Sequence, residues 1–222
     1  MNKTILSALA VAFVAGGAWF LTKPSQPADP IISNALESVE EAAEGAIPDM
    51  VQGNPDAAVE VIEYASFTCP HCADFHQNQY QQIKADYIDT NQIRYVSREV
   101  YFDQPGLWAS MVARCGGEMR FFGISSLVYE QQDEWARAGD GAAVAAALRN
   151  IGKVAGLTDE DLDTCMSDAE TAQALVGWYR ANAEEHNIEG TPSFIINGEK
   201  YSNMSYERFA EVLDEKLAEA AN

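Results

Sequence analysis

The chain has 222 residues, which is enough for one domain with a sizeable core or for one domain that carries an insertion. Its 47% hydrophobic and 10% aromatic residues are ordinary for a globular protein, but 34 acidic against 14 basic residues give a formal net charge of −20. So acidic a surface repels phosphate backbones, which excludes nucleic acid as a favoured partner. The simplest role of the acidic residues is to keep the protein soluble.

The N-terminal segment is predicted to direct export. An uncharged apolar run extends from residue 5 to residue 21, between Lys3 and Lys23. This pattern is typical of an export signal, so residues 1–23 are predicted to form a signal peptide or a membrane anchor. The run lies at the lower length limit for spanning a bilayer, so cleavage and retention both stay open. The periplasm is the expected location, and disulfides persist in such a compartment.

Residues 24–55 are predicted to be a linker with one short helix. Ser33 is a suitable cap for a helix from Asn34 to Glu44, and Gly45 is suited to end it. A turn that begins at Gly53 then closes the segment. We expect the folded domain to begin at about residue 56.

The next three segments predict a βαβ unit. Val59 to Phe67 is a nearly continuous run of β-branched and aromatic residues, which suits a buried strand. Apolar residues recur at helical spacing from Phe75 to Ile88, and Ile93 to Tyr101 is a second strand. This order predicts two parallel strands joined by a helical crossover.

The following segment is predicted to be helical, without a strand, as far as residue 187. Its predicted helices are Leu107 to Cys115, Phe121 to Trp135, Ala142 to Val154, a helix capped by Thr158, and Ala169 to His186. An all-helical insertion into an α/β fold is therefore expected.

The C-terminal segment is predicted to return to the sheet. Ser193 to Ile196 favours a strand, Asn197 and Gly198 are a strong hairpin signal, and Lys200 to Ser202 follow as a paired strand. Ser205 is then a suitable cap for a final amphipathic helix.

Four residues, Cys69, Pro70, His71 and Cys72, lie where the first predicted strand ends and a helix begins. A thiolate there faces unpaired N–H groups and the positive end of the helix dipole, and Pro70 suits the first helical turn. We expect Cys69 to be accessible and Cys72 to be more buried, as disulfide exchange requires. A protonated His71 would stabilise the thiolate further, so the disulfide would be a stronger oxidant.

Other interpretations of this motif are less favoured. A structural disulfide between residues three apart closes almost no loop and would stabilise little. Zinc needs about four ligands; His71 and His76 are near, but a compartment in which disulfides persist and the lack of a second C-x-x-C pair argue against a zinc site. Attachment of c-type haem requires histidine directly after Cys72, where Ala73 stands. No cofactor or metal is expected.

The remaining candidates are two cysteines and one acid. Cys115 and Cys165, if bridged, close a loop of about fifty residues worth roughly 4 kcal/mol; free buried thiols are the alternative. Glu63 interrupts an apolar strand, which is costly for a buried carboxylate without a partner. An exposed edge position and a buried proton-transfer role near Cys72 both stay open for Glu63.

Two motifs of the sequence resemble those of a known family. The segment from Val61 to Cys72 is similar to the active-site region of the DsbA family of disulfide oxidases. Thr191 and Pro192 resemble that family's cis-proline loop, which packs beside the active-site disulfide and binds substrate peptide. Glu63 matches a position where a buried acid influences the active-site cysteines.

This resemblance covers about residues 56–220 and implies a thioredoxin fold with an inserted helical domain. Residues 56–103 and 188–222 would form the thioredoxin-like domain, and residues 104–187 the insertion. A second cysteine pair occurs in only some relatives.

The resemblance also implies an activity. The protein would donate the disulfide of Cys69 and Cys72 to reduced exported proteins, and a DsbB-like membrane quinone reductase would reoxidise it. A disulfide isomerase or reductase, and a non-catalytic peptide-binding protein of the same fold, are the alternatives.

Overall fold

The computed structural model describes residues 47–221. The predicted export segment and the predicted helix from Asn34 to Glu44 lie outside these residues. Among the residues described, no helix is both long enough and apolar enough to cross a membrane.

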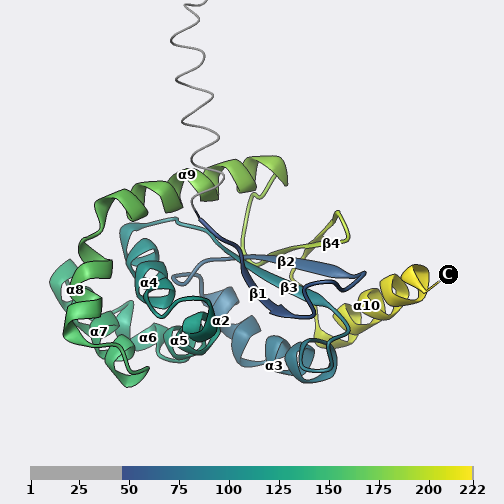
Figure 1. Cartoon of the computed structure of the whole chain (residues 1–222), viewed down its shortest axis with the longest axis horizontal. Helices are drawn as coiled ribbons and strands as arrows, with labels where there is room; N and C mark the ends of the chain where they lie inside the picture. Colours follow the sequence, from purple (N-terminus) through teal and green to yellow (C-terminus); the bar gives the residue numbers. More distant parts are fainter. Residues whose placement is uncertain (1–46, 222) are drawn as a thin grey trace, which may run out of the picture. The chain divides into compact units, whose positions relative to one another are not determined.

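A five-stranded mixed sheet lies at the centre of the described chain (Figure 1). Its strands are β1 (Met50–Gly53), β2 (Glu60–Ala65), β3 (Arg94–Glu99), β4 (Ser193–Ile196) and β5 (Glu199–Ser202), in the spatial order β1-β3-β2-β4-β5. Strands β2 and β3 run parallel, and the other neighbouring pairs are antiparallel. The central position of β2 accounts for its largely apolar sequence.

The predicted βαβ unit is confirmed, with a more broken crossover than expected. Strands β2 and β3 are joined by α2 (Pro70–Gln77), α3 (Gln79–Ile83) and the π-helical turn η1 (Lys84–Ile88). Asn78 separates α2 from α3, and its side-chain amide donates to the backbone oxygen of Asp74. Asparagine side chains compete in this way with the helical bonds of the backbone, which explains the break.

Strand β1 corrects the last part of the linker predicted for residues 24–55. Met50–Gly53 pairs antiparallel with β3 at the edge of the sheet. Gly53 has φ 79°, and a Cβ there would collide with the carbonyl of Ile93. The turn at Gly53 is confirmed, but the strand before it was not predicted, because four residues are too few to show an alternating pattern.

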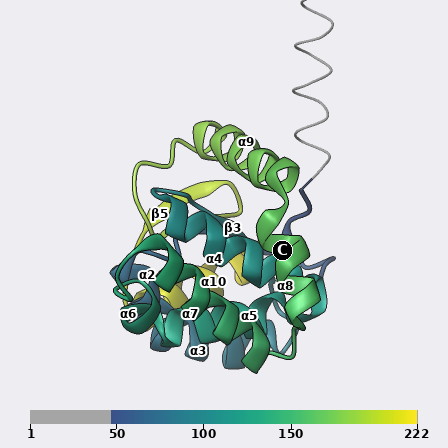
Figure 2. The same cartoon turned by 90° about the vertical axis from the view of Figure 1, so that its left-hand side faces the viewer.

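Helices alone occupy the described chain between β3 and β4. They are α4 (Gln104–Cys115), α5 (Glu118–Glu130), α6 (Gln132–Trp135), α7 (Gly141–Val154), α8 (Asp159–Ser167) and α9 (Ala169–Glu185). Figure 2 shows α4, α5, α7 and α8 grouped together, with α9 apart from them. The single helix expected from Phe121 to Trp135 is two helices, because the chain turns at Gln131. Cys115 and Cys165 form a disulfide that joins α4 to α8.

The C-terminal predictions agree with the structure. Asn197 and Gly198 have φ values of 45° and 83° in the turn between β4 and β5. Ser205 caps α10 (Tyr206–Ala220), with its side chain accepting from the N–H of Arg208. The two faces of the sheet are covered by different helices, α10 and α3 on one side and α9 on the other (Figure 1).

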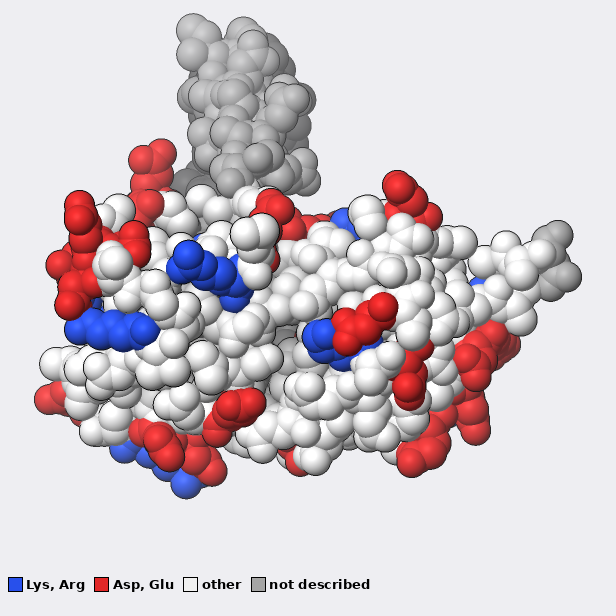
Figure 3. All heavy atoms as spheres, turned by 60° about the horizontal axis from the view of Figure 1, so that its bottom comes forward, with Lys and Arg blue, Asp and Glu red and all other residues white. Residues whose placement is uncertain are grey.

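A third group of buried side chains fills the space among α4 to α8 and extends to Cys72 at the start of α2. The active-site helix therefore packs against both the sheet and the helical segment. On the face shown in Figure 3, acidic side chains form several separate groups, with few lysines or arginines among them.

Candidate active site

Cys69 and Cys72 lie at the beginning of α2, beyond the end of the central strand. Cys69 is the N-cap residue with extended backbone (φ −84°, ψ 118°), and Pro70 opens the helix. Both cysteines are free thiols in this structure. Cys69 is half-buried, whereas Cys72 is 0% exposed. The structure thus has the asymmetry between the two sulfurs that the sequence predicts.

The two thiols differ widely in acidity. A hydrogen bond from the thiol of Cys72 lowers the pKa of Cys69 to about 5, against the opposing effect of burial. The Thr191 side chain and the backbone N–H groups of Cys72 and His71 contribute smaller lowering effects. Burial raises the pKa of Cys72 far above its usual range, and the neighbouring sulfur of Cys69 adds to this shift. At neutral pH, Cys69 is therefore a thiolate and Cys72 a thiol.

The residues between the cysteines, Pro70 and His71, are both exposed. The sequence predicts that a protonated imidazole of His71 would stabilise the thiolate. In the structure, the contribution of His71 to the lowered pKa of Cys69 comes from its backbone N–H group. The beginning of the helix therefore acts through its amides, as the dipole argument requires.

The loop between α9 and β4 forms a second wall of the site. The peptide bond between Thr191 and Pro192 is cis, in agreement with the expected cis-proline loop. Cys69 Sγ lies 3.5 Å from the carbonyl oxygen of Thr191, although the two residues are 122 positions apart. The Thr191 hydroxyl is buried without a well-aligned hydrogen-bond partner among the described residues. The Thr191 side chain lowers the pKa of Cys69 less than the Cys72 thiol does.

Glu63 is fully buried on β2, with a relative exposure of 0%. Its two carboxylate oxygens lie 2.9 and 3.0 Å from Nε2 of His76, and the hydroxyl of Tyr95 donates to it at 2.8 Å. The alternative of an exposed edge position is wrong, because β2 is the central strand. The charge of Glu63 also raises the pKa of Cys72, as a smaller cause than burial.

Two residues of the site, His76 and Gln132, were not predicted, and only His76 has a signal in the sequence. His76 lies one helical turn after Cys72, a spacing that places both on one face of α2, and its ring stacks on Tyr129 at 4.1 Å. Gln132 is buried, and its Nε2 donates to the carbonyl oxygens of Phe67 at 2.8 Å and Cys69 at 2.9 Å. The sequence carries no comparable signal for Gln132, because its partners are more than sixty residues away.

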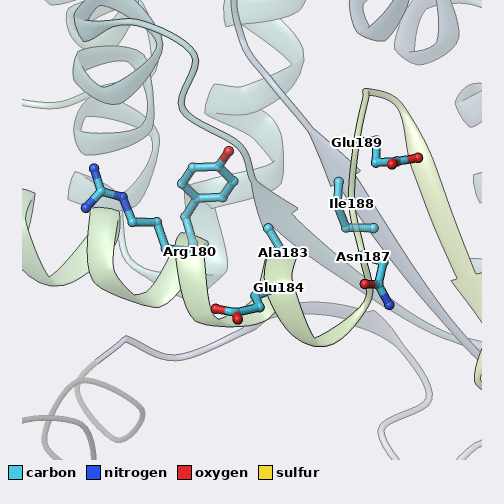
Figure 4. Close-up of a pocket in the computed structure, with 7 residues that line it drawn as sticks. Arg180, Ala183, Glu184, Asn187, Ile188 and Glu189 are labelled. Carbon is cyan, nitrogen blue, oxygen red and sulfur yellow. The ribbon is translucent and has the colours of Figure 1, made fainter. Parts of the chain in front are cut away.

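The surface cavities of the described chain include one that the active-site turn lines and one that it does not line. One of about 270 Å³ lies beside the active-site turn, between Thr68, Pro70, Pro105 and Gln132. The other, of about 330 Å³, lies between α9 and the segment that follows it, and none of the four cysteines lines it (Figure 4). Within residues 47–221, no three His, Cys, Asp or Glu side chains gather in a way that could hold a metal ion.

Comparisons with known proteins agree with this fold. Residues 46–215 match the profile of the family described as Thioredoxin. A Rickettsia bellii protein, provisionally named a protein-disulfide oxidoreductase, is 35% identical over 175 residues, which cover 78% of this chain and 66% of the relative. Two further Rickettsia relatives are covered over 62% and 61% of their lengths, so this chain spans less than two thirds of each of these three relatives.

Two solved structures have a similar fold. Wolbachia pipientis alpha-DsbA1 has a TM-score of 0.72 and 27% sequence identity, over 81% of this chain and 98% of that one. BdbD from Bacillus subtilis has a TM-score of 0.67 and 21% identity, over 77% and 93% of the two chains. The second likeness concerns the fold alone. Together these structures confirm the expected architecture, in which helices are inserted into the sheet domain.

Proposed function

Because the chain belongs to the Thioredoxin family, we propose that it is a DsbA-type protein-disulfide oxidoreductase that donates the disulfide of Cys69 and Cys72 to reduced proteins. The observation that supports this direction is the pKa of Cys69, lowered to about 5. A stabilised thiolate favours the reduced protein, so the oxidised protein readily gives up its disulfide.

The first step is attack by a substrate thiolate on the Cys69 sulfur of the oxidised protein. A bond forms between the substrate sulfur and Cys69 Sγ, and the bond between Cys69 and Cys72 breaks. Cys72 leaves with the electron pair and takes up a proton, because burial raises its pKa far above neutral pH. Attack on Cys69 is preferred because this sulfur is accessible and Cys72 is buried.

The second step releases the product. A second substrate thiolate attacks the substrate sulfur of the mixed disulfide, and Cys69 leaves as a thiolate. A thiol of low pKa is a good leaving group, so the acidity of Cys69 favours this direction. Two electrons pass in total from the substrate dithiol to the two cysteines, which end reduced.

Neighbouring residues would hold the substrate and manage the proton. The backbone at Thr191 and Pro192 lies beside Cys69, just before strand β4, and would bind substrate backbone. Glu63, buried next to His76, would influence the proton on Cys72. The disulfide of Cys115 and Cys165 would have a structural role, since it joins α4 to α8.

The compartment and the oxidant complete the proposal. Residues 1–23 would direct export to the periplasm, where reduced exported proteins are the substrates. A membrane quinone reductase like DsbB would then accept two electrons from the reduced cysteines and restore the disulfide.

The experiment compares wild type with Cys69→Ser and Cys72→Ser during oxidation of a reduced dithiol protein. Wild type should form the substrate disulfide stoichiometrically, and Cys69→Ser should not. Cys72→Ser should not complete the oxidation, but its Cys69 should still form mixed disulfides. The reduction potential of the Cys69 and Cys72 pair in the wild type should lie far above that of thioredoxin, which is about −270 mV. Full activity in Cys69→Ser would contradict the proposal. A potential near that of thioredoxin, or strong reshuffling of scrambled disulfides, would favour the reductase or isomerase alternative.

A further inference from the structure

The corner between α5 and α6 holds the active-site helix at both of its ends. Before α2 begins, Gln132 donates to the carbonyl oxygens of Phe67 and Cys69. At the last residue of α2, the side-chain amide of Gln77 donates to the carbonyl oxygen of Tyr129 at 3.1 Å. The corner thus contacts the helix through two glutamines, only one of which touches a reacting residue.

The Cys69 carbonyl is the acceptor from which α2 begins. It accepts from the N–H groups of Cys72 at 3.1 Å and Ala73 at 3.2 Å. Gln132 adds a side-chain donor to the same oxygen and also binds the strand side of the turn at Phe67. The orientation of this peptide determines where the first N–H groups of α2 point. Those of His71 and Cys72 point at the Cys69 sulfur and lower its pKa.

Gln132 is well suited to hold this turn. An amide nitrogen has two N–H donors, one for each carbonyl oxygen. The side chain is only 6% exposed, so water cannot readily replace it. The indole N–H of Trp135 donates to the carbonyl oxygen of Val128 at 2.8 Å, which fixes α6 against α5. The amide is therefore held on a corner that is itself bonded in place.

We propose that Gln132 is a positioning residue for disulfide exchange, which keeps the first N–H groups of α2 directed at the Cys69 sulfur. This inference rests on the proposed function, and it makes the helical segment a determinant of the chemistry on the sheet. Its prediction is that loss of the Gln132 donors weakens the protein as an oxidant and makes Cys69 less acidic.

The test compares Gln132→Met with Gln77→Met. Methionine is similar in length to glutamine but has no donor, so each variant loses only the bonds between the corner and one end of α2. In Gln132→Met, the equilibrium constant for oxidation of glutathione should fall about tenfold, or about 30 mV. The pKa of Cys69, from the pH dependence of its alkylation, should rise. Gln77→Met should change neither quantity, whatever its effect on the melting temperature.

Equal shifts in the two variants, or no shift in Gln132→Met, would overturn the inference. Should Gln132→Met fail to fold, Gln132→Asn replaces it, because the shorter amide cannot reach both carbonyl oxygens. The same shifts in the equilibrium constant and in the pKa of Cys69 are expected, and their absence would also overturn the inference. The alkylation measurement does not need substrate. A wild-type protein without exchange activity would contradict the proposed function, while a Cys69 pKa that rises only in the Gln132 variants would still support the positioning role.

Discussion

Replacement of Cys72 by alanine should make Cys69 markedly less acidic. The largest cause of the lowered pKa of Cys69 is the hydrogen bond from the Cys72 thiol, and alanine removes that donor. A hydrogen bond to a charged group contributes roughly 1.5–3 kcal/mol, which corresponds to about one to two pKa units. The pKa should therefore rise from about 5 to roughly 6–7. It should stay below that of a free cysteine, because the N–H groups of the first turn remain.

The assay is the rate of alkylation of Cys69 between about pH 4 and pH 9, with the thiolate absorbance as a second measurement. At about pH 6 the thiolate fraction should fall from about nine tenths in the wild type to between about a half and a tenth in Cys72→Ala. Cys69→Ala supplies the background for both signals. A pKa in Cys72→Ala within half a unit of the wild type would refute the dominant role of the neighbouring thiol. A pKa as high as about 8.5 would refute the contribution of the helix amides instead.

Three further predictions concern stability. Glu63→Leu or His76→Leu alone should reduce the free energy of unfolding in urea by about 3–5 kcal/mol, because each removes one member of a buried ion pair. The double variant should cost less than the sum of the two, and full additivity would contradict the pairing. Joint replacement of Cys115 and Cys165 by alanine should cost about 4 kcal/mol for a separation of 50 residues, and an unchanged melting temperature would argue against a stabilising bridge. The pKa of Cys69 is lower in the folded than in the unfolded chain, so its contribution to the stability of the reduced protein is complete above about pH 8.5 and is lost as the pH falls towards about 5. As the pH falls over that range, the melting temperature of the reduced protein should therefore fall relative to that of the oxidised protein. A constant difference between the two would contradict the shift.

The parts of the fold that the sequence predicted correctly are those with local causes. The turn at Asn197 needs a residue that tolerates positive φ, and Thr158 caps α8 through a reciprocal pair of bonds with Asp161. Strand β1 was missed because its pairing with β3 gives little signal in four residues. The break at Gln131 was missed because apolar residues continue at helical spacing across it.

The site was predictable only in part. The thiol pair and its place at the start of a helix follow from adjacent residues. Thr191 was connected to Cys69 through a family resemblance, since nothing local links positions 122 residues apart. The burial of Glu63 stayed open because it depends on which strand is central, and its partner His76 becomes evident only once α2 packs on the sheet. Gln132 lay beyond sequence reasoning for the same reason.

The antiparallel pairing of β2 with β4 has a consequence for folding during synthesis on the ribosome. A growing chain contains both reactive sulfurs early, but β4 and the Thr191 loop are translated only after the whole helical segment. Until then β2 presents an open edge, which is a template for association with other chains. A ribosome-bound fragment that ends before residue 188 should therefore aggregate or recruit chaperones, whereas one that extends past α10 should not.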